Sequence, residues 1–234
     1  MLQNYQMHQP YNLQEKHLVA IDDVVFGYEN NELKLLLFQR NLEPAKGQWS
    51  LVGGWVNPNE SCEDASCRVL KSITGLENIF MEQVKVFSKP NRDPGGRVIS
   101  VVFYALIDIQ KHNHQLSDQF GAKWWPAPLL PELIFDHNEM VDCALTKLRI
   151  KASRDLVGRD LLPEEFTITQ LRQLYNSIFM KDFDPGNFRK KILSLKTLQR
   201  LNKKSKEGSK KGAYFYRFNE NAEGHDIKER IVNI

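Results

Sequence analysis

Short apolar runs alternate with polar turns along the first 150 residues of the chain. Runs of strand length bounded by Gly, Pro, Asn or Asp predict β-strands, whereas apolar positions three and four residues apart predict helices. The expected elements are, in order, a strand over 18–26, a strand over 33–38, a glycine-rich loop over 49–56, a helix over 60–74, strands over 84–87 and 98–109, and a helix over 137–150 with room to extend to 154. Strands with helices at both ends of the unit indicate an α/β layer fold for about residues 10 to 150.

The last third of the chain has helical spacing first and basic residues afterwards. The expected elements are a helix over 166–180, a second helix from 185 to about 201, a Lys-, Ser- and Gly-rich loop over 202–212, and an alternating strand over 213–218. This order is that of a winged helix-turn-helix. Because Gly158 and Pro163 interrupt the pattern, we expect a linker over 157–165 and two domains, 1–157 and 158–234.

Charge is divided unevenly between these two parts. The net charge is +3 over 234 residues, yet residues 1–150 carry 14 basic and 18 acidic side chains, whereas residues 151–234 carry 18 basic and 11 acidic ones. Between Gly186 and Phe218, 11 basic side chains stand against one acidic side chain. This asymmetry predicts an acidic domain joined to a basic domain that binds a polyanion.

Composition excludes several classes of protein. No apolar stretch approaches the roughly 18 to 20 residues of a membrane span, and the polar N-terminal segment lacks the apolar core of a secretory signal. We therefore expect a cytoplasmic protein with no membrane contact. Cys62, Cys67 and Cys143 form no CxxC pair, which argues against a disulfide framework or a zinc site.

A glycine, an acidic residue and a basic residue recur at the spacing of a known motif. The pattern Gly54-x5-Glu60-x7-Arg68, followed by Gly75-Leu76, resembles the Nudix box, G-x5-E-x7-R-E-U-x-E-E-x-G-U, in which U is a bulky aliphatic residue. This resemblance implies a Nudix-type α/β/α sandwich with a mixed sheet. Because Glu60 and Arg68 lie eight residues apart, we expect them to pair and to hold the loop on the helix.

The metal-binding half of the box is missing. In the Nudix family, three glutamates on one helical face bind Mg²⁺, which polarises a pyrophosphate. This chain has Val69, Ser72 and Ile73 at those positions, and the neighbouring acids Glu63 and Asp64 fall on other faces at about 100° per residue. We therefore expect no metal, no cofactor, no catalytic residue and no enzymatic activity. A cavity that has lost these oxygens can still bind a small molecule.

Polar and aromatic side chains beside the predicted sheet are candidates for lining such a cavity. Several also have ordinary structural interpretations: Arg40 and Lys46 as solvated charges, Trp49 as a core anchor and Asp136 as a helix N-cap. The basic members suit an anionic or phosphorylated ligand, and the aspartates with a Trp face equally suit a sugar. The candidate effector-binding residues are Asp22, Asp23, Gln39, Arg40, Lys46, Trp49, Arg92, Asp93, Arg97, Asp136 and His137.

The second C-terminal helix has the two faces that a DNA-reading helix requires. Apolar side chains between 188 and 198 share one side, and hydrogen-bond donors share the other. The following Lys-rich loop suits phosphate contacts as a wing, although such runs are often plain solvated surface. The candidate DNA-binding residues are Asn187, Arg189, Lys190, Ser194 and Thr197 on the helix, and Lys203, Lys204, Lys206, Lys210 and Lys211 on the wing. On the last strand we expect Phe215 and Phe218 in the core, and Tyr214 and Tyr216 at the DNA backbone.

A degenerate Nudix box followed by a basic winged helix-turn-helix resembles the Nudix-related transcriptional regulators, a bacterial family of NrtR- and AraR-like repressors. Segments 93–101, 135–137, 166–171 and 187–191 are also similar to that family. The resemblance implies a homodimer that binds a palindromic operator in double-stranded DNA. It further implies release of the operator when a small molecule occupies the Nudix-type domain, either a sugar such as arabinose or a nucleotide sugar such as ADP-ribose.

Two other functions compete with this interpretation. One is an active Nudix pyrophosphohydrolase that acts on ADP-ribose-type substrates and uses its basic tail to capture RNA or substrate. The other is an RNA-binding or ribosome-associated module, which the groove-sized helix and the wing disfavour, because sequence-specific RNA modules present exposed stacking aromatics.

Overall fold

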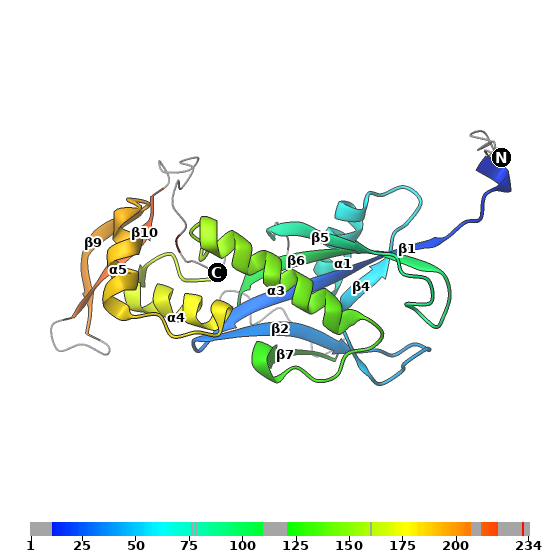
Figure 1. Cartoon of the computed structure of the whole chain (residues 1–234), viewed down its shortest axis with the longest axis horizontal. Helices are drawn as coiled ribbons and strands as arrows, with labels where there is room; N and C mark the ends of the chain where they lie inside the picture. Colours follow the sequence, from blue (N-terminus) through cyan, green and yellow to red (C-terminus); the bar gives the residue numbers. More distant parts are fainter. Residues whose placement is uncertain are drawn as a thin grey trace, which may run out of the picture.

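A seven-stranded mixed sheet occupies the middle of the molecule, and a three-stranded sheet lies at one end (Figure 1). The computed structural model describes residues 11–75, 77, 79–109, 121–159, 161–206, 212–219 and 231. The strands of the large sheet are β1 (Leu18–Glu29), β2 (Glu32–Gln39), β3 (Trp49–Ser50), β4 (Val52–Trp55), β5 (Met81–Phe87), β6 (Val98–Asp108) and β7 (Ala122–Pro126). Two short 3-10 helices, η1 (Tyr11–Leu13) and η3 (Ala127–Leu129), flank them.

The large sheet has the order β3-β2-β1-β6-β5, with β4 paired to β1 and β7 paired to β2. β1 and β6 run parallel and the other pairs are antiparallel. The strands predicted over 18–26 and 33–38 are present as β1 and β2, which form a hairpin. The hairpin turn places Asn30 and Asn31 in the left-handed region at φ 52° and 64°. The sequence pattern missed β7 and took β3 and β4 for a loop, because such short strands depend on backbone pairing with neighbours more than on their own periodicity.

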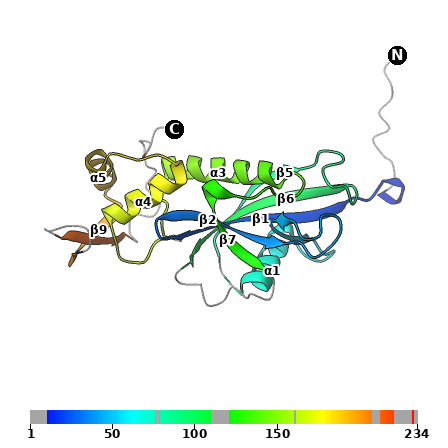
Figure 2. The same ribbon diagram turned by 90° about the horizontal axis from the view of Figure 1, so that it is seen from below.

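Two helices cover opposite faces of this sheet (Figure 2). Helix α1 (Cys62–Thr74) packs on one face, and helix α3 (His137–Arg154) packs on the other. α1 begins with a capping box between Ser61 and Asp64 and ends at Gly75, which has φ 71°. The α/β/α sandwich expected from the sequence is therefore confirmed.

The C-terminal part is a winged helix, as predicted, with two strands, β8 and β9, that the sequence pattern assigned to helices and loop. Its elements are β8 (Phe166–Thr167), α4 (Ile168–Phe179), α5 (Pro185–Ser194), β9 (Leu198–Ser205) and β10 (Ala213–Phe218), with the strand order β8-β10-β9. Thr167 caps α4 in a capping box with Gln170, and Asp184 accepts a hydrogen bond from the backbone N–H of Asn187 at the start of α5.

The predicted extent of the second helix was wrong. We expected it to continue to about residue 201, but α5 ends at Ser194, and Lys196 has the left-handed φ of 56°. Residues 198–205 instead form β9, whose backbone pairs with β10. Pairing within the sheet overrides the helical spacing of the leucines, and the first part of the expected wing loop, residues 202–205, is strand.

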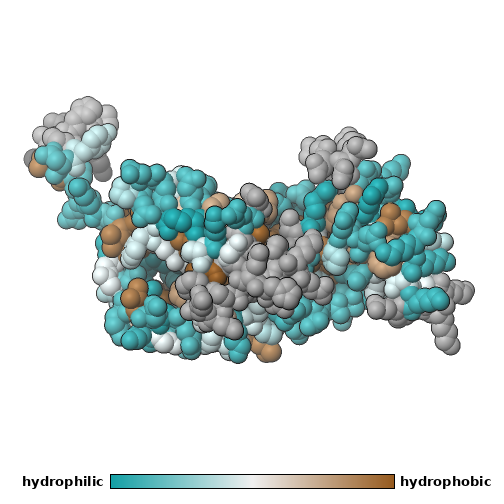
Figure 3. Space-filling model, turned by 180° about the vertical axis from the view of Figure 1, so that it is seen from behind, coloured by the Kyte–Doolittle hydropathy of each residue, from teal (hydrophilic) through white to brown (hydrophobic). Residues whose placement is uncertain are grey.

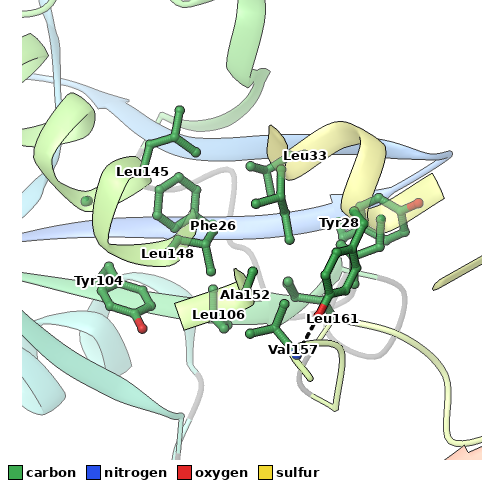
Figure 4. Packing of buried hydrophobic residues seen from close by; sticks show 14 of the residues in the cluster. Phe26, Tyr28, Leu33, Tyr104, Leu106, Leu145, Leu148, Ala152, Val157 and Leu161 are labelled. Atoms are coloured by element: carbon green, nitrogen blue, oxygen red, sulfur yellow. Dashed lines mark hydrogen bonds between the residues drawn. The ribbon is translucent and has the colours of Figure 1, made fainter. Parts of the chain in front are cut away.

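One continuous core joins the two parts of the chain. Helix α3 extends from the large sheet to α4, and the β1–β2 hairpin also reaches α4 (Figure 1). Figure 4 shows Tyr28 and Leu33 of this hairpin in the same buried cluster as Leu161 and Val157 of the connecting segment. The hydroxyl of Tyr175 accepts a hydrogen bond from the Val157 N–H at 3.3 Å. A structural change in the sheet can thus reach the winged helix through packed side chains.

On the face shown in Figure 3, hydrophobic residues form small separate patches within a mostly hydrophilic surface. None of the helices in the described segments combines the length and the apolar character that crossing a membrane would require. The exposed large apolar side chains include Tyr11 and Trp55.

Candidate functional site

A cavity of about 660 Å³ opens where β1, β2, β4 and α1 meet the loop after β5. The sheet supplies its floor and the segments 39–47 and 92–93 supply its rim. Seven of the eleven predicted effector-binding residues line it: Asp22, Gln39, Arg40, Lys46, Arg92, Asp93 and His137. The fold therefore gathers residues that lie more than 100 positions apart in the chain.

A buried carboxylate forms the polar floor of the cavity. Asp22 is 8% exposed, and its Oδ2 accepts a hydrogen bond from Ser100 Oγ at 2.5 Å. Its Oδ1 lies 3.7 Å from His137 Nε2, and its Oδ2 lies 4.0 Å from an Arg92 nitrogen. Gly53 is required beside it, because a Cβ there would lie 2.6 Å from Asp22 Oδ1.

His137 is a neutral neighbour of this carboxylate. Burial lowers the pKa of His137, Asp22 raises it in part, and Arg92 lowers it again. The backbone N–H of Leu51 donates to Nδ1 at 3.2 Å, so Nδ1 carries no proton and the remaining ring proton is on Nε2, facing Asp22. The imidazole thus offers one donor to the cavity floor.

Asp136 fixes the orientation of the Arg92 side chain. The Arg92 side chain is 4% exposed, and its guanidinium donates two hydrogen bonds to Asp136, at 2.9 Å and 2.6 Å. Asp136 precedes α3 but makes no side-chain cap hydrogen bond, because its carboxylate faces Arg92. Asp136 therefore positions Arg92 and does not itself line the cavity. Such a bidentate pair fixes the guanidinium more firmly than a single contact would.

The cavity rim is basic and partly aromatic. Arg40 Nε donates to the carbonyl oxygens of Leu42 and Pro44, at 3.1 Å and 2.8 Å, and its guanidinium lies 5.8 Å from the centre of the Phe135 ring. Lys46 is exposed at the rim. Phe38, Trp55 and Phe135 also line the cavity and were not predicted, because nothing in their local sequence separates a cavity aromatic from a core aromatic.

Three other predicted residues lie outside the cavity lining. Asp23 points to the opposite face of the sheet, is fully buried beneath α1 and accepts a hydrogen bond from Ser66. Trp49 packs edge-on against Trp125 at 5.2 Å. Arg97 donates to the carbonyl oxygens of Ser88 and Lys89 and so fixes the loop. Placing Asp23 in the cavity was an error of strand alternation, since adjacent residues point to opposite faces.

The α1 wall of the cavity does not fit Mg²⁺. Val69 is 5% exposed and packs on Gly54, where a Cβ would lie 2.8 Å from it. The Ser72 hydroxyl donates to the Val69 carbonyl at 2.8 Å, and Ile73 lines the cavity with a hydrocarbon surface. No group of three or more His, Cys, Asp or Glu side chains that could hold a metal occurs among the described residues. A hard cation that needs about six oxygen ligands has no suitable donor set on this wall.

The rest of the box serves the structure. Arg68 makes two hydrogen bonds to Glu60, at 2.9 Å and 2.6 Å, and a third to the Trp55 carbonyl at 2.9 Å. The hydrogen bond from Arg68 is the main cause that lowers the pKa of Glu60 to about 2. The predicted pairing is confirmed, and it ties β4 to the start of α1.

The exposed face of α5 is polar and basic. Phe188 and Ile192 are buried against α4 and the small sheet, whereas Asn187, Arg189, Lys190 and Ser194 are exposed. Thr197 was predicted on this helix, but it lies after the helix end, and its hydroxyl is buried without a hydrogen-bond partner among the described residues. Thr197 is therefore not placed to contact DNA.

The wing is a β-hairpin with a basic surface. Lys203, Lys204 and Lys206 are exposed on or just after β9, and Lys210 and Lys211 lie outside the described residues. Arg200 and Lys204 flank the Tyr214 ring at 4.7 Å and 4.6 Å. Arg200 is not among the predicted DNA-binding residues, because helical spacing predicts a helix where β9 lies.

The predicted order of the aromatic residues on β10 is shifted. Tyr216, not Phe215, is the core residue: it is 3% exposed and its hydroxyl accepts a hydrogen bond from Arg189 at 3.4 Å. Phe215 is partly exposed under Lys203, at 5.0 Å. A register irregularity between Tyr214 and Tyr216 displaces the alternation. Phe218 packs against Phe166 at 5.0 Å, as predicted for the core.

These features define a class: a Nudix-type α/β/α domain with an altered box, followed by a winged helix. Residues 20–142 match the NUDIX domain, and residues 158–218 match the NrtR DNA-binding winged helix domain. The chain belongs to the Nudix family, and its C-terminal part is a winged helix DNA-binding domain of the NrtR type. The resemblance to Nudix-related transcriptional regulators is confirmed.

The chain is similar to three known proteins. It is 28% identical over 205 residues to the ADPR responsive transcriptional repressor NtrR of Acinetobacter baylyi, covering 86% of this chain and 82% of the relative. It is similar to Shewanella oneidensis NrtR in complex with a 27mer DNA, with 28% identity, a TM-score of 0.80, and 91% and 98% of the two chains covered. The NUDIX domain of that protein complexed with ADP ribose is 30% identical, with a TM-score of 0.51, covering 61% of this chain and 94% of that one. An ADP-ribose pyrophosphatase of Methanocaldococcus jannaschii is 34% identical over 132 residues, covering 56% of this chain and 75% of the relative.

Proposed function

We propose that this chain is a ligand-responsive transcriptional repressor. Residues 158–234 bind a palindromic operator, the protein acts as a homodimer in the cytoplasm, and residues 1–157 release the operator when they bind ADP-ribose or a close nucleotide sugar. The observation that carries this proposal is the combination of a cavity whose α1 wall offers no metal ligands with a winged helix whose exposed face is basic. The ADPR responsive repressor of Acinetobacter and the Shewanella complexes with DNA and with ADP ribose support the same pairing of DNA and ADP-ribose.

The dimensions and chemistry of the cavity favour a nucleotide sugar over a free pentose such as arabinose. Its volume of about 660 Å³ lies within the approximately 300–1,000 Å³ of pockets that enclose drug-sized ligands. Arg40 and Lys46 on the rim suit a diphosphate in the absence of a metal, Asp22 on the floor suits ribose hydroxyls, and the rim aromatics suit a base. A free pentose would use only part of this surface.

We predict that ADP-ribose weakens operator binding by a factor between about 5 and 150, the usual range for coupled sites. The measurement is fluorescence anisotropy of a labelled fragment from the region upstream of the gene, titrated with protein with and without ADP-ribose. In Lys46→Ala, the loss of one charge-assisted contact should weaken ADP-ribose binding about tenfold and leave DNA affinity unchanged. Equal DNA affinity with and without ADP-ribose in the wild type would contradict the proposed effector.

We further predict that ADP-ribose binding does not depend on Mg²⁺ and that ADP-ribose is not cleaved. By calorimetry, the Kd in Mg²⁺ and in EDTA should agree within about twofold, because the α1 wall supplies no oxygen ligands. Turnover approaching ordinary enzyme rates, on the order of 1 per second or more, would support the pyrophosphohydrolase alternative instead. The pyrophosphatase relative makes this measurement necessary.

A further inference from the structure

We propose that α3 transmits the state of the cavity to the DNA-binding helix, and that Arg149 is the positioning residue through which it acts on α4. This inference rests on the proposed function, because it describes how ligand binding in the cavity would reach the operator. It follows from contacts near the two ends of α3 and from the contacts that join α4 to the start of α5.

The first turn of α3 belongs to the cavity. Asp136, just before the helix, holds Arg92, and His137, its first residue, faces Asp22 on the floor. A ligand that pairs with Arg92 or Asp22 competes with these contacts. Any adjustment of this cluster is therefore also an adjustment of the N-terminal end of α3.

The far part of α3 holds the end of α4. Arg149 Nε donates to the Ile178 carbonyl oxygen at 2.8 Å, in a partly buried contact. Ile178 lies in the last turn of α4, where carbonyl oxygens have no partner within the helix, so this hydrogen bond satisfies a group that the helix itself leaves open. Asp136 and Arg149 are 13 residues apart, which corresponds to about 20 Å along a rigid helix.

α4 in turn fixes the start of α5. Arg172 donates to the Phe183 carbonyl at 3.0 Å, and Asn176 accepts from the Phe183 N–H at 3.0 Å and donates to Asp182 at 2.9 Å. The turn between the two helices is thus bound to α4 on both sides. A shift of the C-terminal end of α4 must carry α5 with it, and α5 presents Asn187 and Lys190 to DNA.

The test compares two substitutions on the same helix. Arg149→Met keeps the long side chain and removes the donor to Ile178, whereas Lys147→Met removes a cation that contacts Glu82 at 2.9 Å and the Gln83 carbonyl on β5, away from α4. We expect Arg149→Met to bind ADP-ribose and DNA separately as the wild type does, but with the effect of ADP-ribose on DNA affinity reduced to about twofold or less. Lys147→Met should keep the wild-type effect. If ADP-ribose lowered the DNA affinity of Arg149→Met as much as that of the wild type, transmission would be assigned to the β1–β2 hairpin and the proposal would be overturned.

A second measurement needs no ligand and judges the proposal even if ADP-ribose is not the effector. In Asp136→Asn, hydrogen exchange of the amides at residues 176–179 should accelerate about tenfold, because the loosened end of α3 weakens its hold on α4. In the Arg149→Met background, Asp136→Asn should cause no further acceleration. Unchanged exchange in Asp136→Asn, or additive acceleration in the double variant, would overturn the inference. Failure of the wild type to respond to ADP-ribose would count against the proposed function alone.

Discussion

Replacing Lys190 with glutamate is expected to lower operator affinity on the order of 100-fold, about 2.7 kcal/mol. Lys190 is exposed on α5, on the side opposite the buried Phe188 and Ile192, so its ammonium faces the DNA that this helix would enter. The substitution removes one favourable contact and adds repulsion from phosphates. Because neither packing residue is touched, the thermal unfolding transition should remain within a few degrees of the wild type.

The control for Lys190→Glu is Lys123→Glu. Lys123 is exposed on β7, in the large sheet, and the substitution changes the net charge by the same amount. Anisotropy titrations over a range of salt concentrations separate local from general electrostatic effects, since each lost phosphate contact lowers the salt slope by about one. Equal losses in both variants would mean that net charge, and not the face of α5, determines binding.

The wing offers a finer comparison with the helix. Lys204 lies on β9, with its ammonium near the Tyr214 ring, and is placed for phosphate contact rather than for reading bases. Substitutions there should weaken all DNA sequences alike, whereas substitutions on α5 should change the preference among sequences.

The sequence predicted those elements whose stabilising contacts are local. The strands on either side of the β1–β2 turn were predicted, and α1 and α4 each begin two residues after the predicted start. The turn and the two capping boxes depend on residues within a few positions of each other. The end of α5 was not predictable in this way, because the Leu198 backbone is paired with Phe218 of β10, which lies 20 positions further along the chain. Helical spacing alone cannot reveal that pairing with a distant strand competes with continuation of the helix.

The cavity could be predicted in its composition but not in its arrangement. Arg92 and Asp136 were both candidates, yet only the fold shows that Asp136 orients Arg92 from behind and does not line the cavity. One error was avoidable. Asp22 and Asp23 are adjacent on a strand, so only one of them can face a given side of the sheet.

Asp23 is expected to have a large effect on how the stability of the protein depends on pH. Asp23 is fully buried between β1 and α1, among Ile21, Val25 and other apolar side chains. Burial raises its pKa to about 8 from an ordinary 3.8, Ser66 opposes this with a hydrogen bond, and the neighbouring Asp22 adds to the increase. Its Oδ2 has no hydrogen-bond partner within the described part of the chain. At neutral pH the folded protein therefore holds Asp23 mostly as the neutral acid.

The raised pKa makes folding weaker as pH rises. Between about pH 4 and 8 the folded state retains a proton that the unfolded chain has released, so the contribution of Asp23 to the free energy of unfolding falls by up to about 1.4 kcal/mol per pH unit and levels off above pH 8. We expect Asp23→Asn, which is neutral at every pH, to remove this slope and to exceed the wild type in stability at pH 8. Urea denaturation of both proteins at several pH values gives the difference directly, free of contributions from other groups. Ser66→Ala is the matched control: without the hydrogen bond that favours the charged form, the pH at which the slope levels off should move upward. Parallel stability curves for wild type and Asp23→Asn would show that the Asp23 carboxyl is ionised in the folded protein, with a partner or water that compensates its burial.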